Sequence, residues 1–204
     1  MGSLTLLDLL SSIVVSSLLF LTALSMNERA SSNTYAAQTA LTVQQNMTSV
    51  VENLEWDFRL VGYCNSFTNA TPSSEYIVSG DTNSIAFQAD LNNDGVMDRV
   101  QWSLGTTPIP GCPNPNVRML TRTTTINGVT KTYSSNLGVT VFHLTYFDAI
   151  GDTVYTPFTN PSTVQLIRVE LRLEPVAAYA DTANKQIFSS WMQTRLVSKN
   201  LNNR

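Results

Sequence analysis

An uncharged apolar stretch near the N-terminus constrains this chain more than any other feature of its sequence. No charged side chain occurs from Leu9 to Asn27, and most of these residues are Leu, Ile, Val, Phe, Ala or Met. In a helix these residues, about 19 in number, reach roughly 28 Å, close to the hydrocarbon thickness of a bilayer. The stretch therefore predicts a helix that spans a membrane or is enclosed by other helices.

A second helical pattern follows the apolar stretch without interruption. Apolar residues recur at intervals of three and four, the spacing of one helix face, at Ala40, Val43, Met47, Val50, Leu54, Phe58 and Val61. No Gly lies between Gly2 and Gly62, and no Pro precedes Pro72. We expect one continuous helix of about 55–58 residues, roughly 85 Å long, that ends near Gly62. Residues 1–27 are apolar all round, whereas residues 28–63 need a globular domain to cover one face.

The apolar stretch has one main alternative, a cleaved secretory signal. Such a signal has a basic start, a shorter apolar run and a small-x-small site followed by a break. Met1, Gly2 and Ser3 carry no basic side chain, and no Gly or Pro separates the apolar stretch from the amphipathic part. We therefore expect the helix to be retained in the mature protein.

The remainder of the chain, residues 64–204, has the alternation of two that is typical of strands. Ile167, Val169, Leu171 and Leu173 alternate with charged residues. The pair Asn127-Gly128 is typical of a tight hairpin turn. Further strands are predicted at residues 76–79, 84–89, 100–103, 117–122, 139–147 and 187–197. We expect one antiparallel sheet packed on the amphipathic part of the helix, which makes the fold class α+β. We call residues 64–204 the headpiece.

Composition narrows the functional classes. Of 204 residues, 13% are charged and 43% are hydrophobic, which fits one folded domain with an ordinary core. Ser, Thr and Asn are abundant, as on the outside of cells. The net charge of −3 provides no basic surface for phosphate groups, so we expect no nucleic-acid binding.

Several segments of the chain resemble one protein family. Residues 4–10, Leu-Thr-Leu-Leu-Asp-Leu-Leu, resemble the start of a mature type IV pilin or type II secretion pseudopilin. Four further stretches resemble minor pilins and minor pseudopilins, in family order: residues 56–63, 87–95 with 99–102, 141–148 and 195–201. The resemblance implies a structural subunit of a type IV pilus-like filament or secretion pseudopilus, outside the cell or in the periplasm. It also implies a headpiece packed on a long N-terminal helix.

The resemblance further implies how the chain is processed and where it is found. The family's leader ends in Gly before the cleavage point, so Gly2, Ser3 and Leu4 form the expected processing site, with Ser3 at the place of that Gly. Expected partners are a prepilin peptidase, the inner-membrane assembly platform and membrane lipid. The implied location is a single-pass inner-membrane protein that later enters a filament.

The expected assembly residues are Leu4, Asp8, Ser12 and Ser16. Asp8 takes the place of the family's Glu, which implies pairing with the free N-terminal ammonium of a related subunit already in the filament. Asp8, Ser12 and Ser16 repeat every fourth residue and would let neighbouring helices approach closely. The alternative is that Asp8 only favours the helix dipole in the first turn.

Two cysteines, Cys64 and Cys112, occur without a Cys-x-x-Cys pair, so a zinc site lacks its ligand spacing. In an exported chain a single disulfide between them is the simplest interpretation. Such a bridge would close a loop of about 50 residues and stabilise the fold by roughly 2–4 kcal/mol.

One acidic segment has two interpretations. Oxygen side chains at alternate positions and a Gly fit the first part of a calcium-binding loop, at Asp90, Asn92, Asp94, Gly95 and Asp98. Gln101 stands where the loop should supply a bidentate Glu. An acidic hairpin turn built on Asn93-Asp94-Gly95 explains the same residues and is favoured, so no cofactor is expected apart from this calcium alternative.

Motifs of catalysis are not found in the sequence. It contains no Gly-x-Ser-x-Gly, no phosphate loop and no His-Glu-x-x-His, and its one histidine, His143, lies in a predicted strand. We therefore expect no enzyme. The alternative to a filament subunit is a membrane-anchored extracellular binding domain or adhesin that does not polymerise.

Overall fold

The computed structural model describes residues 2–66, 76–158, 160–176, 189–197 and 199–202. It divides into two compact units, Met1–Leu41 and Thr42–Arg204. The boundary falls within one long helix, so the first unit is helical and the second contains the end of that helix and the strands.

Helix α1 (Gly2–Arg59) is continuous over 58 residues, as the absence of Gly and Pro predicts. It ends at the predicted place, because Gly62 has a φ of +72°, a conformation that Gly adopts without steric cost. The ring of Tyr76 lies directly over Gly62, so a Cβ at this position would clash. The Gly62 N–H then donates to the carbonyl of Gln88 at 2.8 Å, which links the helix end to the headpiece.

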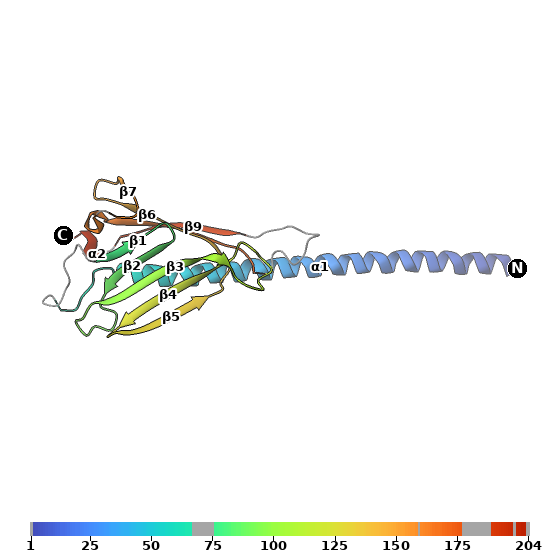
Figure 1. Cartoon of the computed structure of the whole chain (residues 1–204). Coiled ribbons are helices and arrows are strands. Elements are labelled where there is room, and N and C mark those ends of the chain that lie inside the picture. The colour runs from blue at the N-terminus through green and yellow to red at the C-terminus, as the bar shows by residue number, and fades with distance from the viewer. Residues whose placement is uncertain (1, 67–75, 159, 177–188, 198, 203–204) are drawn as a thin grey trace. The chain divides into compact units, whose positions relative to one another are not determined.

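The strands form two antiparallel sheets. The first contains β1 (Ile77–Gly80), β2 (Ser84–Ala89), β3 (Asp98–Pro108), β4 (Arg118–Ile126) and β5 (Val129–Ser135), in that order (Figure 1). The second has the order β7 (Thr153–Val154), β6 (Val139–Phe147), β8 (Leu166–Leu173) and β9 (Ser190–Leu196). A 3-10 helix η2 (Pro161–Thr163) and a short helix α2 (Lys199–Asn202) complete the described elements. The class α+β is therefore confirmed.

The prediction of one sheet was wrong. After β5 the chain turns at Gly138, whose φ is +82°, and β6 begins a second sheet instead of pairing with β5. The carbonyl of Glu174 lies directly against Gly138, and the Glu174 N–H donates to the Gly138 carbonyl at 2.8 Å. A side chain at residue 138 would meet this backbone, so the turn that separates the two sheets requires Gly.

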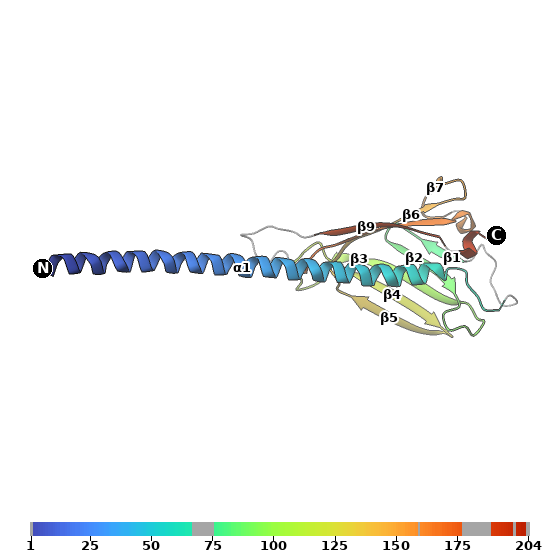
Figure 2. The ribbon, with the colours of Figure 1, turned by 180° about the vertical axis from the view of Figure 1, so that it is seen from behind.

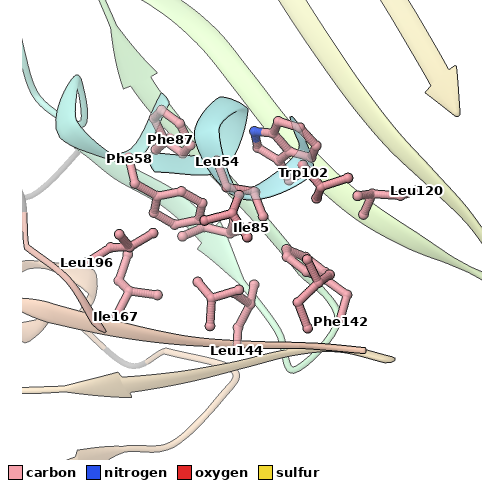
Figure 3. Close-up of a cluster of buried hydrophobic side chains, with 14 of the residues drawn as sticks. Leu54, Phe58, Ile85, Phe87, Trp102, Leu120, Phe142, Leu144, Ile167 and Leu196 are labelled. Carbon is pink, nitrogen blue, oxygen red and sulfur yellow. The ribbon is translucent and has the colours of Figure 1, made fainter. Parts of the chain in front are cut away.

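The core of the second unit lies between the end of α1 and both sheets. The predicted apolar face is buried at Val43, Met47, Val50, Leu54 and Phe58. Figure 2 shows this part of α1 in front of β3 and β4. In Figure 3 the side chains of the helix point toward those of both sheets, at Leu54, Phe58, Ile85, Phe87, Trp102, Leu120, Phe142, Leu144, Ile167 and Leu196.

Several strand predictions agree closely with the structure. The bounds of β2 and β6 are those predicted, whereas β3 and β4 are longer than expected. The last predicted strand corresponds to β9, and its first residues, 187 and 188, lie outside the described residues. The alternation in β8 is also as expected, with Ile167, Val169, Leu171 and Leu173 buried.

The predicted Asn-Gly hairpin is confirmed and yields a stability prediction. Ile126 pairs with Val129, and φ is 50° at Asn127 and 78° at Gly128. A Cβ on Gly128 would meet nothing within 4 Å, so a side chain here is strained only through the backbone. We expect Gly128→Ala to lower the free energy of unfolding by about 1–2 kcal/mol. Urea unfolding of the full chain in detergent measures this change.

The matched control is Gly105→Ala in β3. Gly105 does not have a positive φ, and its nearest neighbour would be the Met119 carbonyl oxygen, 3.4 Å from the new Cβ. We expect this variant to lose less stability than Gly128→Ala. Equal losses in the two variants would contradict the backbone explanation.

Candidate functional site

The N-terminal half of α1 exposes a continuous apolar surface. The large apolar side chains from Leu6 to Met26 are between 43% and 72% exposed. Singly exposed apolar residues are ordinary, but contiguous apolar surface of this extent marks a site that contacts protein or lipid. The predicted apolar segment is therefore the main candidate site of the chain.

Four hydroxyl groups within this surface donate hydrogen bonds to backbone carbonyls of the same helix. Ser11 Oγ donates to the Asp8 carbonyl at 2.9 Å, and Ser17 Oγ donates to the Val14 carbonyl at 2.8 Å. Thr22 and Ser25 donate in the same way, to Leu19 and Thr22. Because these groups need no water as a partner, their burial in lipid or among helices costs little.

The predicted assembly residues lie on this helix. Asp8, Ser12 and Ser16 are exposed, and their spacing of four in a confirmed helix places them on one face. Gly2, Ser3 and Leu4, the predicted processing residues, have a helical backbone. The first turn of α1 contains no acidic residue. None of the ion pairs among the described residues includes Asp8.

Among the helices that the structure describes, α1 is the one long and apolar enough to cross a membrane. Its most apolar stretch is not buried against any other part of the described chain. A signal sequence near an N-terminus can also pass this test of length and hydropathy. The mature N-terminus distinguishes the two, because a signal sequence is removed and an assembly helix is retained.

The second unit holds a buried charged network, centred on Asp57 of α1, that the sequence analysis missed. Asp57 is 1% exposed, and its carboxylate accepts from Arg122 Nε at 2.6 Å and from the second guanidinium nitrogen at 2.8 Å. The indole N–H of Trp102 donates to the same carboxylate at 2.7 Å. The Asp57 carboxylate raises the pKa of the Arg122 guanidinium. The network joins α1 to β3 and β4.

The sequence did contain one signal of this network. Val50, Leu54, Asp57 and Val61 are spaced by four, three and four residues, so Asp57 occupies a position of the buried helix face. A carboxylate at such a position requires a partner, because a buried unpaired charge is very costly. The identity of that partner, 65 residues further along the chain, is not contained in local periodicity.

A cavity of about 410 Å³ adjoins the network. It is lined by Ser49, Val50, Asn53, Trp102, Leu120, Arg122, Tyr133, Ser134 and Leu137. Arg122 is its one charged residue and is already paired with Asp57. The cavity therefore offers no unpaired charge to a ligand.

The acidic segment between β2 and β3 is a loop of eight residues, 90–97, that joins the two paired strands. Ala89 pairs with Asp98 across it, and φ is 59° at Asn93 and 82° at Gly95. Asp90 is 1% exposed and organises the turn: its Oδ1 accepts from the Asp94 N–H at 3.2 Å, and its Oδ2 accepts from the Gly95 N–H at 2.9 Å.

Further side chains of the turn bond to one another and to neighbouring segments. Asn92 Oδ1 accepts from the Asp94 N–H at 3.2 Å, and Asp94 Oδ1 accepts from the Val96 N–H at 2.8 Å. Asp94 Oδ2 accepts from Asn127 Nδ2 at 3.1 Å, at the tip of the β4–β5 hairpin. Hydrogen bonds from Asn92, Val96 and Asn127 lower the pKa of the Asp94 carboxyl.

Asp98 differs from the other acidic residues of the turn. It is 2% exposed, and its Oδ2 accepts from the Leu91 N–H at 3.1 Å, but its buried Oδ1 has no hydrogen-bond partner. Burial raises the pKa of the Asp98 carboxyl, the backbone N–H groups of Leu91 and Asn127 act in the opposite direction, and the nearby Asp94 and Asp90 raise it. Within the described part of the chain, no three Asp, Glu, His or Cys side chains converge as metal ligands.

The expected disulfide is not formed. Cys64 and Cys112 are free thiols; Cys64 Sγ lies 3.6 Å from the Gly95 carbonyl, and Cys112 Sγ lies 3.9 Å from the Val176 carbonyl. The reason is topological, because β3 separates the loop that contains Gly95 from the loop that contains Cys112. A strand of 11 residues extends roughly 35 Å, whereas bridged Cα atoms lie about 4.4–6.8 Å apart.

Comparisons with known proteins identify no relative. No family model matches the chain, and neither a curated protein nor a solved structure matches it. The functional argument therefore depends on the residues and geometry described above.

Proposed function

We propose that this chain is a structural subunit of a type IV pilus-like filament or secretion pseudopilus, assembled through the N-terminal half of α1. One observation carries the proposal: the helix is apolar and exposed from Leu6 to Met26, whereas from Val43 onward the same helix has one face buried in a folded headpiece. In a soluble protein the apolar half of the helix would be exposed to water. In a subunit that moves from lipid into a bundle of helices, this half is buried in both places, while the other half packs in the headpiece core.

Physical features of the helix support this proposal. The apolar half meets the length and composition of a membrane span, so it can remain in the bilayer before assembly. The hydroxyls of Ser11, Ser17, Thr22 and Ser25 donate to carbonyls of the same helix, so they keep a hydrogen-bond partner both in lipid and in a helix bundle. The headpiece, with its separate core, remains outside the bilayer.

We assign Asp8 the role of an assembly contact. A carboxylate within an apolar surface is costly to bury without a partner, and none of the described ion pairs supplies one. In the proposed filament the partner is the N-terminal ammonium of a neighbouring subunit. Ser12 and Ser16, on the same face, permit close helix contact. A prepilin peptidase and an assembly platform in the inner membrane are the proposed partners before assembly.

The proposal is tested on cells that produce the full chain. Material sheared from the cell surface, or released from the periplasm, is inspected by electron microscopy and labelled with an antibody to the headpiece, and the mature N-terminus is determined by mass spectrometry. We expect labelled filaments and a mature chain that keeps the residues from Leu9 to Asn27. A mature chain that begins after Met26 would refute the proposal.

A matched control is a variant without residues 5–27, which keeps the whole second unit. We expect this variant outside the filament fraction. Detergent-soluble monomers of the full chain, with no filaments under any condition, would instead favour an anchored binding domain.

A further inference from the structure

A buried oxygen without a partner lies in the turn between β2 and β3. Asp98 Oδ1 is inaccessible to solvent and accepts no hydrogen bond, while the same carboxylate is held in the turn through Oδ2 and the Leu91 N–H. An unpaired buried charge is costly, so such an oxygen calls for a positively charged partner. None of the ion pairs among the described residues includes Asp90, Asp94 or Asp98.

The sequence positions around this oxygen match those of a calcium loop. Counting Asp90 as the first position, Asn92 and Asp94 are the third and fifth, and Asp98 is the ninth. Calcium loops take ligands from these positions and from the backbone carbonyl of the seventh, which here is Val96. The sixth position is Gly95, whose φ of 82° provides the sharp turn.

We propose that the turn at residues 90–98 binds one calcium ion, with the buried Oδ1 of Asp98 among its ligands. The other protein ligands are the side-chain oxygens of Asp90, Asn92 and Asp94 and the carbonyl of Val96. This donor set mixes carboxylate, amide and carbonyl oxygens, which is typical of calcium and not of zinc. Because the carboxylates do not converge in the structure described here, the ion draws them together when it binds.

The strength and selectivity of the site follow from its ligands. Gln101 occupies the twelfth position, where a bidentate Glu would complete a high-affinity loop. We therefore expect a dissociation constant of about 10⁻⁴ to 10⁻³ M, the range of extracellular calcium modules. Magnesium demands near-ideal octahedral geometry and dehydrates reluctantly, so it should bind much more weakly.

Calcium in this turn would also link three segments of the headpiece: the residues after α1, the β4–β5 hairpin and the start of β3. Asp90 Oδ2 accepts from the Asn65 N–H at 3.1 Å, just after the end of α1. Asp94 contacts Asn127 at the β4–β5 hairpin, and Asp98 begins β3. The bound ion should therefore raise the thermal stability of the second unit, in addition to filling the turn.

The test uses the full chain in detergent after treatment with a chelator. Isothermal titration with calcium chloride and thermal unfolding at 10 mM calcium are compared with the same measurements in magnesium chloride. We expect binding heat with calcium and a rise in the unfolding midpoint of about 3–8 °C. Absence of heat and of any midpoint shift with calcium would overturn the proposal, as would an equal response to magnesium.

Three variants locate the site. Asp98→Asn should lose at least tenfold in calcium affinity while its stability without calcium is unchanged or higher, because it removes a buried charge. Asp94→Asn, at an exposed carboxylate, should weaken calcium binding even if Asp98→Asn folds poorly. The matched control is Asp148→Asn: Asp148 Oδ1 accepts from the Ile150 and Asp152 N–H groups in another hairpin turn. This control should keep the full calcium response, and an undiminished response in both loop variants would refute the assignment.

Discussion

Replacing Arg122 with methionine is expected to lower the free energy of unfolding by about 3–5 kcal/mol. The carboxylate of Asp57 is 2% exposed in its side chain and is paired with Arg122 at 2.6 Å. The variant leaves this charge buried, with the Trp102 N–H as its remaining partner among the described hydrogen bonds. Desolvation of an uncompensated charge is the physical reason for the large loss. Urea unfolding of the full chain in detergent at pH 7 measures it.

Two further variants make the Arg122 experiment decisive. Arg59→Met removes an exposed pair with Glu55, in which the side chains are 73% and 36% exposed, and should cost less than about 1 kcal/mol. The double variant Asp57→Leu with Arg122→Met removes both charges and should recover much of the lost stability. If Arg122→Met costs no more than Arg59→Met, the buried network does not stabilise the headpiece.

Local periodicity accounts for the parts of the fold that the sequence predicted. The helix face at Val43, Met47 and Leu54 and the alternation in β8 depend on spacings of three to four and of two residues, which the chain displays directly. The Asn127-Gly128 turn is equally local, because its two residues fix the backbone twist. The candidate assembly surface, which is the apolar half of α1, could also be predicted from the sequence, because length and apolar composition define it.

Long-range pairing accounts for what the sequence did not predict. Nothing in the strand patterns says that β5 ends one sheet and that β6 begins another, because that choice depends on the Gly138 turn against Glu174. The partner of Asp57 lies on a strand of the first sheet, and the separation of Cys64 from Cys112 is set by the length of β3. The sequence likewise does not predict that Asp98 Oδ1 lacks a partner, because this follows from the structure, in which the Leu91 N–H donates to the other oxygen, Oδ2.

Asp8→Ala is expected to abolish entry of the chain into filaments while membrane insertion is unchanged. Removal of a carboxylate makes the apolar half easier to insert, so the membrane fraction should keep its share of the protein. In the proposed filament the same change would leave the ammonium of a neighbouring subunit buried without its counter-charge. A loss of about 3–5 kcal/mol, typical of a broken buried pair, corresponds to at least a hundredfold drop in incorporation.

Quantitative immunoblots of membrane and sheared-filament fractions from the same cells measure both effects. Asp8→Glu keeps the carboxylate on a longer side chain and should retain incorporation. Ser17→Ala is the matched surface control, because the Ser17 hydroxyl is already bonded to the Val14 carbonyl and needs no neighbouring subunit. Filaments of normal abundance from Asp8→Ala would show that the carboxylate has no part in assembly. The exposed apolar half would then have to assemble through its apolar and small residues alone.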